Sequence, residues 1–120
     1  MKKILIIDDD PFFAKNIKGV LDPKLYEVVS AADGEEGLKK IKDSVPDGIL
    51  LDIMMPKMNG MDFLKQLNEA YGKNKIPVII TSNLSSFTKI AEGVSLGIRG
   101  YIFKSNESLQ NIGDTITKMF

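Results

Sequence analysis

The chain contains no cysteine and no histidine. Without cysteine there is no disulfide framework and no thiolate-bound metal. Without histidine, the common imidazole base, nucleophile and metal ligand is missing as well. Any metal site must therefore use oxygen ligands and hold a hard cation. A chain without cysteine also fits a reducing compartment, and we expect a cytoplasmic location.

An excess of one charge and long apolar runs are absent too. The 16 basic and 16 acidic residues balance, so no overall field favours nucleic acid or an anionic membrane. The apolar run at residues 4–7 is too short for a signal peptide, and no later run approaches the ~20 residues of a membrane span. We therefore expect the chain to bind neither nucleic acid directly nor a membrane. At 120 residues, 43% of them hydrophobic, the chain fits one globular domain over residues 1–120.

Short apolar runs alternate with segments whose apolar residues recur at helical spacing. The runs predict strands near residues 4–7, 26–30, 48–51, 77–80 and 101–103. The stripes between them predict five helices, one of which is marked by Phe87, Ile90, Ala91 and Val94. This alternation predicts a parallel five-stranded sheet covered by helices on both faces. Because residues 26–30 are mixed in polarity, as an edge strand would be, we expect the flavodoxin-like order 2-1-3-4-5.

Polar residues follow four of the predicted strands. Aspartates 8–10 end the first strand, and the later strands end in Asp52, Thr81 and Lys104. In an α/β sheet such ends meet where the winding reverses, and ligands bind there. Clustered carboxylates repel, so a divalent cation and a lysine would stabilise them, and Mg2+ suits such oxygen ligands. A carboxylate can also accept a phosphoryl group covalently. Asp10, followed by Pro11, is expected to cap a helix.

These motifs resemble the receiver domains of bacterial two-component response regulators. The matching stretches occur in order and with similar spacing, at residues 4–10, 32–38, 46–52, 55–60, 77–81 and 100–104. The resemblance covers essentially the whole chain. It implies that Asp52 is the phosphoacceptor and that Asp8, Asp9 and Asp52 hold Mg2+ together with the backbone carbonyl of Met54.

The resemblance also implies a switch. Thr81 would move its hydroxyl toward the phosphoryl group, Lys104 would pair with that group, and the rotamer of Tyr101 would follow. An aromatic in a strand is also commonly a packing residue, so both interpretations of Tyr101 stay open. Ser105 follows Lys104 where the family usually has proline after a cis bond. Without proline a trans bond is expected, which leaves the reach of Lys104 open.

The function implied is that of a signalling switch in a phosphorelay. The donor would be a histidine kinase or a histidine phosphotransfer protein, and the chain would catalyse at most its own phosphorylation and dephosphorylation. The face formed by residues 87–120 would change conformation and control an output protein that the sequence does not identify. The chain would be a monomer or a phosphorylation-dependent dimer.

Two other classes of function compete with the switch, a binding module and an enzyme on a similar sheet. A pseudo-receiver that only binds partners stays possible because of Ser105. Phosphatases that use a strand-end aspartate need a second one two residues on, where this chain has Met54, and a P-loop nucleotidase needs a glycine-rich lysine loop that is missing.

Overall fold

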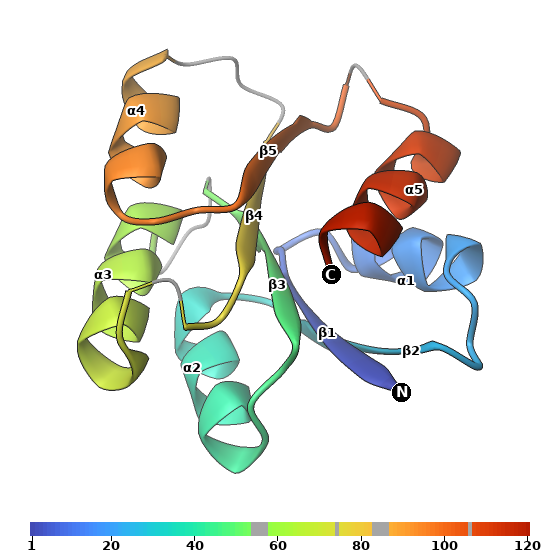
Figure 1. The fold of residues 1–120 in the computed structure, drawn as a ribbon, viewed down its shortest axis with the longest axis horizontal. Coiled ribbons are helices and arrows are strands. Elements are labelled where there is room, and N and C mark those ends of the chain that lie inside the picture. The colour runs from blue at the N-terminus through green and yellow to red at the C-terminus, as the bar shows by residue number, and fades with distance from the viewer. Residues whose placement is uncertain (54–57, 74, 83–86, 106) are drawn as a thin grey trace.

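The computed structural model describes residues 1–53, 58–73, 75–82, 87–105 and 107–120, with the backbone alone described for residues 87–90. Each run predicted as a strand forms one: β1 (Lys2–Ile7), β2 (Tyr26–Ala31), β3 (Gly48–Asp52), β4 (Val78–Ser82) and β5 (Gly100–Phe103). Helices follow each strand: α1 (Pro11–Val20), α2 (Gly34–Asp43), α3 (Gly60–Tyr71), α4 (Phe87–Ser95) and α5 (Leu109–Met119) (Figure 1). None of these described helices combines the length and the apolar character that crossing a bilayer requires.

The strands form one parallel sheet in the order β2-β1-β3-β4-β5 (Figure 1). This order confirms the prediction, including the edge position of β2. Helices α1 and α5 cover one face, and α2, α3 and α4 lie on the other. The direction of winding reverses between β1 and β3, so the carboxyl ends of these neighbours border the crevice where ligands bind in such sheets.

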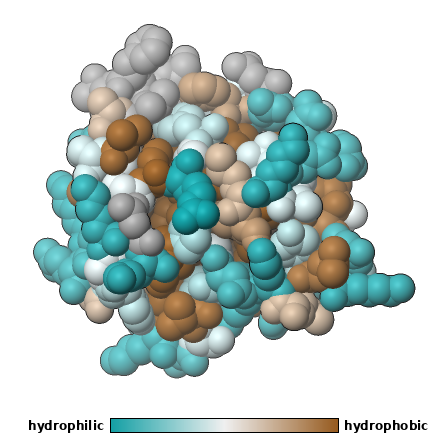
Figure 2. Space-filling view, in the orientation of Figure 1, coloured by the Kyte–Doolittle hydropathy of each residue, from teal (hydrophilic) through white to brown (hydrophobic). Residues whose placement is uncertain are grey.

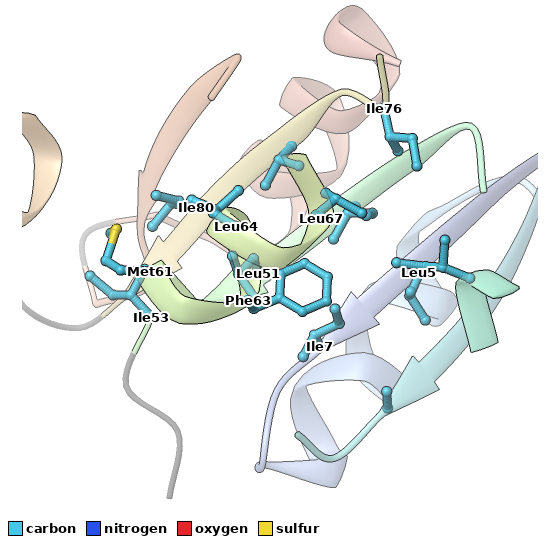
Figure 3. Close-up of a cluster of buried hydrophobic side chains, with 14 residues drawn as sticks. Leu5, Ile7, Leu51, Ile53, Met61, Phe63, Leu64, Leu67, Ile76 and Ile80 are labelled. Carbon is cyan, nitrogen blue, oxygen red and sulfur yellow. The ribbon is translucent and has the colours of Figure 1, made fainter. Parts of the chain in front are cut away.

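The two faces of the sheet have separate apolar cores because successive strand residues point to opposite sides. Leu5, Ile7 and Leu51 pack with Phe63 and Leu64 of α3 on one face (Figure 3). On the other face Ile4 and Ile6 pack with the buried residues of α1 and α5. Strands buried on both faces explain the continuous apolar runs of the sequence. On the face shown in Figure 2 the described surface is mostly hydrophilic, and apolar side chains form separate patches.

Helix starts agree with the capping signals of the sequence. Asp10, Asp33, Asn59 and Ser108 each have extended backbone, and each side chain accepts a hydrogen bond from an N–H of the first helical turn. Such caps satisfy N–H groups that have no partner within the helix. The cap at Asp10 was predicted, and it directs α1 away from the carboxyl end of β1.

Two glycines let helices approach the sheet closely. A Cβ on Gly60 would lie 2.6 Å from the Cα of Ile53, so only glycine lets α3 begin this near the end of β3. A Cβ on Gly93 would lie 2.8 Å from the Cδ1 of Ile80. Helix α4 therefore meets β4 through a position without a side chain.

This contact sets the orientation of the described part of α4. Two residues of the apolar stripe that marked this helix point away from the core, since Ala91 is exposed and Val94 is 62% exposed. The predicted helix is confirmed, and in its described part the face with Gly93 permits a closer approach to the sheet than the face with the larger residues. The side chains of Phe87 and Ile90, also in the predicted stripe, lie outside the described part of the chain.

Candidate functional site

Strand register brings the predicted polar residues to one rim of the sheet. Ile7 of β1 pairs with Leu51 of β3, so the next residues, Asp8 and Asp52, follow at neighbouring strand ends. Asp52 in turn pairs with Thr81 of β4. Hydrogen bonds of the ladders therefore fix these positions without help from the loops.

Three carboxylates gather at this rim. One oxygen each from Asp8, Asp9 and Asp52 lies within 4.8 Å of the others. Asp8 is 5% exposed and Asp52 is 7% exposed, whereas Asp9 is open to solvent. An oxygen-only donor set that is partly open to water suits a hard divalent cation such as Mg2+. Met54, the fourth residue that the family resemblance implies as a ligand, lies outside the described residues.

Lys104 supplies a positive charge to the same rim. Its N–H donates to the carbonyl of Ser82 (2.9 Å), which continues the β4–β5 ladder by one bond. Its ammonium donates to Oδ2 of Asp8 and lies 3.6 Å from Oδ2 of Asp52. The ammonium also lies 4.4 Å from the centre of the Phe13 ring, a favourable cation–π position.

The replacement of proline by Ser105 leaves this geometry possible. All peptide bonds in the described part of the chain are trans, as expected for the bond between Lys104 and Ser105. Lys104 reaches the carboxylates from that trans backbone. The reach of the lysine, which the sequence left open, is therefore sufficient here.

Hydrogen bonds also hold the first aspartate in place. Oδ1 of Asp8 accepts the N–H of Asp10 (2.9 Å), while Oδ2 accepts from Lys104. Asp10 uses its own Oδ1 to cap α1 by accepting the N–H of Phe12 (3.0 Å). Asp10 is thus a structural cap, as predicted, and Asp8 points toward the other carboxylates.

Thr81 and Tyr101 lie on the β4–β5 side of the rim. Thr81 is 1% exposed, and its hydroxyl has no hydrogen-bond partner among the described residues. Burial raises the pKa of Tyr101, a hydrogen bond with Ser82 opposes this effect, and the charge of Asp52 adds to the increase. The ring of Tyr101 also packs against that of Phe103, with centroids 4.9 Å apart. Tyr101 is therefore both a packing residue and a neighbour of the site.

Comparison with known families decides what kind of site this is. The family model of the response regulator receiver domain matches residues 4–116, nearly the full chain. The chain belongs to this family. As a receiver domain it is a phosphoryl-accepting signalling switch rather than a conventional enzyme, and its aspartate cluster is consistent with a Mg2+ site.

Curated relatives of this receiver domain include longer transcriptional regulators. It is 38% identical over 104 residues to the alkaline phosphatase synthesis transcriptional regulatory protein PhoP of Bacillus subtilis, covering 86% of the chain and 42% of PhoP. It is also 38% identical over 104 residues to the transcriptional regulatory protein CpxR of Escherichia coli, covering 87% of the chain and 43% of CpxR. The chain thus spans less than half the length of these relatives.

Solved structures share the fold of this receiver domain over its whole length. The chemotaxis protein CheY4 of Vibrio cholerae has a TM-score of 0.89 and 28% identity, covering 100% of this chain and 99% of that one. A receiver domain of a Francisella response regulator has a TM-score of 0.85 and 31% identity, covering 99% and 96%.

Two residues of the receiver domain's site were not identified from the sequence. Phe13 falls in the helical pattern that follows the first strand and was not predicted to belong to the site, yet its ring contacts the ammonium of Lys104. Ser82 ends β4 directly after Thr81, is 1% exposed and hydrogen bonds to Tyr101. A second hydroxyl directly after Thr81, at the end of an apolar run, was the signal that could have identified Ser82.

Proposed function

We propose that Asp52 accepts a phosphoryl group from a phosphohistidine of a partner protein. In this transfer the bond between the histidine nitrogen and phosphorus breaks, a bond from a carboxylate oxygen of Asp52 to phosphorus forms, and the imidazole leaves. The observation that carries the proposal is the convergence of Asp8, Asp9, Asp52 and the Lys104 ammonium at one rim. Phosphoryl transfer depends mainly on positioning and on charge neutralisation, which these groups supply.

The carboxylates of Asp8, Asp9 and Asp52 would hold the Mg2+ ion. Their oxygens are close enough to share one cation, and the donor set is hard. The family resemblance adds the carbonyl of Met54. When bound, Mg2+ would reduce the repulsion between the acceptor carboxylate and the incoming phosphoryl oxygens.

Two side chains would respond to the new phosphoryl group. Lys104 already contacts Asp8 and lies near Asp52, so a small movement would bring its ammonium to the phosphoryl oxygens. Thr81 pairs in register with Asp52. Its buried hydroxyl would donate a hydrogen bond to the same phosphoryl oxygens. Phosphorylation adds roughly −1.5 to −2 charges at neutral pH, a strong attraction for both groups.

The response would reach the surface through α4, β5 and α5. Tyr101 belongs to this face through β5 and also lies near Asp52, so its rotamer would follow the movement of Thr81. The face formed by residues 87–120 would then alternate between two packings and bind an output protein in one of them. The receiver would act as a monomer or as a dimer that forms on phosphorylation.

We place the domain, residues 1–120, in a cytoplasmic phosphorelay. Its donor would be a histidine kinase or a histidine phosphotransfer protein, since the chain has no histidine of its own. The only chemistry it would catalyse is its own phosphorylation and dephosphorylation. The relatives that are transcriptional regulators support an output in gene control.

Labelling with acetyl phosphate and Mg2+ tests this proposal. Mass spectrometry should detect an adduct of about 80 Da, the mass of a phosphoryl group. Asp52→Asn should abolish the adduct, while Asp43→Asn, which replaces an exposed aspartate at the end of α2, should leave it unchanged. An Asp52→Asn protein that labels as well as wild type would refute the assignment. Absence of both the adduct and Mg2+ binding in wild type would instead indicate a pseudo-receiver.

A further inference from the structure

Strand β2 forms a regular edge of the sheet. It is the outermost strand beside β1 (Figure 1), and its six residues pair with β1 in unbroken register. Edge strands are usually protected from further pairing by lysine, proline or a bulge. The sequence of β2, Tyr-Glu-Val-Val-Ser-Ala, contains neither residue, and its pairing has no bulge.

The backbone of β2 has groups that point away from the sheet. The carbonyls of Leu25 and Ala31 accept the N–H groups of Lys2 and Asp8 (2.8 and 3.0 Å), so the backbone groups of odd-numbered residues face β1. In a parallel ladder the N–H and C=O of the intervening residues face the opposite way. Val28 and Ser30 therefore direct their backbone groups outward. Within the described residues these groups have one partner, the Lys40 ammonium on the carbonyl of Ser30.

A groove follows this edge on the side of α1. Two hollows of about 230 and 180 Å3 both include Pro11, Ala14 and Ser30 in their walls. The first also includes Val28, and the second extends to Asp8. We call the combined feature the β2–α1 groove. It runs along the strand edge from the middle of β2 to the rim that carries the carboxylates.

The part of the β2–α1 groove beside Val28 is positively charged, whereas the part toward the rim is lined by Asp8, Glu36 and Lys40. Lys15 and Lys18 are exposed on α1 and line the hollow beside Val28 and Ser30. Side chains of a strand alternate between faces, so a strand added outside β2 would direct every second side chain toward α1. Carboxylates at those positions would pair with the two lysines.

We propose that β2 binds an extended acidic segment of a partner protein as a sixth strand. The segment exchanges backbone hydrogen bonds with Val28 and Ser30, and its alternate carboxylates face Lys15 and Lys18. Strand addition of this kind obtains affinity from the main chain and specificity from alternate side chains. Lys40 is displaced from the Ser30 carbonyl when the new strand supplies an N–H there. The inference does not depend on phosphorylation of Asp52.

Charge argues against a second copy of the chain on the same edge. Two β2 strands paired antiparallel in one sheet would place both α1 helices on the same face of that sheet. Lys15 and Lys18 of each copy would then meet the same residues of the other across the junction. Like charges brought together are destabilising, whereas an acidic segment neutralises them.

Hydrogen exchange with a defined peptide tests the proposal. The probe is a short capped peptide alternating glutamate and valine, and the matched peptide alternates lysine and valine. NMR should show slower hydrogen exchange of the Val28 and Ser30 amides when the glutamate peptide is added, and no slowing when the lysine peptide is added. Equal protection by both peptides, or by neither, overturns the proposal. Protection of the same amides by self-association without peptide, detected by sedimentation, also overturns it.

Variants separate the backbone and charge contributions. Ser30→Pro removes an outward N–H at an exposed edge position, where proline is tolerated, and should abolish peptide protection at Val28. Lys15→Glu with Lys18→Glu should weaken binding about tenfold, through two lost surface pairs and new repulsion. The control, Lys39→Glu with Lys65→Glu, makes the same charge change on α2 and α3 and should retain binding. Equal loss in both double variants overturns the proposal. Acetyl phosphate labelling of Asp52 should persist throughout.

Discussion

Helices α1 and α4 each begin beside the site, yet they are attached to the sheet differently. Helix α1 buries Phe13, Ala14 and Ile17 in the core. Within residues 91–95 of α4, Gly93 is the only buried position, and Val94 is 62% exposed. Helix α1 is therefore held by large apolar contacts, and the described part of α4 by a close approach of backbone to Ile80.

The polar groups of the site also differ in how completely they are hydrogen bonded, and again the side beside α1 is held more firmly than the side beside α4. Both oxygens of Asp8, beside α1, have hydrogen-bond donors. The hydroxyl of Thr81, beside α4, has none among the described residues. The side proposed to hold the cation is thus preformed, while the side proposed to respond to phosphorylation would lose no described hydrogen bond of the Thr81 hydroxyl on moving. Such weakly held elements are the ones that conformational switches use.

The largest expected effect on stability comes from comparing an apolar side chain of α1 with one of α4. Ile17→Ala should lower the free energy of unfolding by about 3 kcal/mol, because it leaves a cavity under α1. Val94→Ala removes an exposed side chain and should change it by less than about 0.5 kcal/mol. Urea denaturation of both variants measures the difference. Equal losses would mean that α4 is held as firmly as α1.

Replacing Lys104 tests the preformed side. Lys104→Met keeps the apolar stem over Phe13 but removes the cation facing Asp8 and Asp52, and should lower the unfolding free energy by about 2 kcal/mol. Millimolar Mg2+ should restore much of that loss. Lys104→Arg keeps the charge and serves as the control. Thermal melts with and without Mg2+ measure the difference in stability. A Lys104→Met variant as stable as wild type without Mg2+ would contradict a stabilising role of the ammonium.

Replacing Thr81 tests the responsive side. Thr81→Val exchanges a buried hydroxyl without a described partner for a methyl group of similar size, and should raise the unfolding free energy by about 1 kcal/mol. Thr115 in α5 is the control, because its hydroxyl donates to the carbonyl of Asn111 (3.0 Å). Thr115→Val should bring no such gain. If both variants are equally destabilised in urea, Thr81 has a partner in solution.

The smallest effect is the pH dependence that Tyr101 contributes. Burial raises the pKa of Tyr101 above its ordinary 10.0. The stability linked to this group is therefore complete below pH 10 and is lost as the pH rises through the higher folded-state pKa. Tyr101→Phe should flatten this part of the alkaline decline relative to wild type. Urea titrations across that pH range detect it, and parallel curves would place Tyr101 in solvent.

Much of the fold could be predicted because local signals and global packing agree. Continuous apolar runs identified strands buried on both faces, and Asp10 with Pro11 identified the start of α1. The convergence of Asp8, Asp52 and Lys104 followed from parallel topology alone, since strand ends share a rim. These predictions depend on backbone direction and not on side-chain conformation.

The remainder depends on contacts between distant side chains. An apolar stripe locates a helix, but it did not show that Gly93 would meet the sheet in α4. Likewise the hydrogen bond between Ser82 and Tyr101 requires particular rotamers on two strands. Neither the contact of Gly93 nor this hydrogen bond can be derived from spacing along the chain, because both depend on how distant segments pack around them.

The contact between Lys104 and Asp8 joins residues 96 positions apart. Such a contact forms only after β1, β3, β4 and β5 have all taken their places in the sheet. A nascent or partly unfolded chain therefore has no assembled acceptor pocket. The ability to accept a phosphoryl group therefore depends on complete folding of the domain, and partly folded molecules do not enter the signalling reaction.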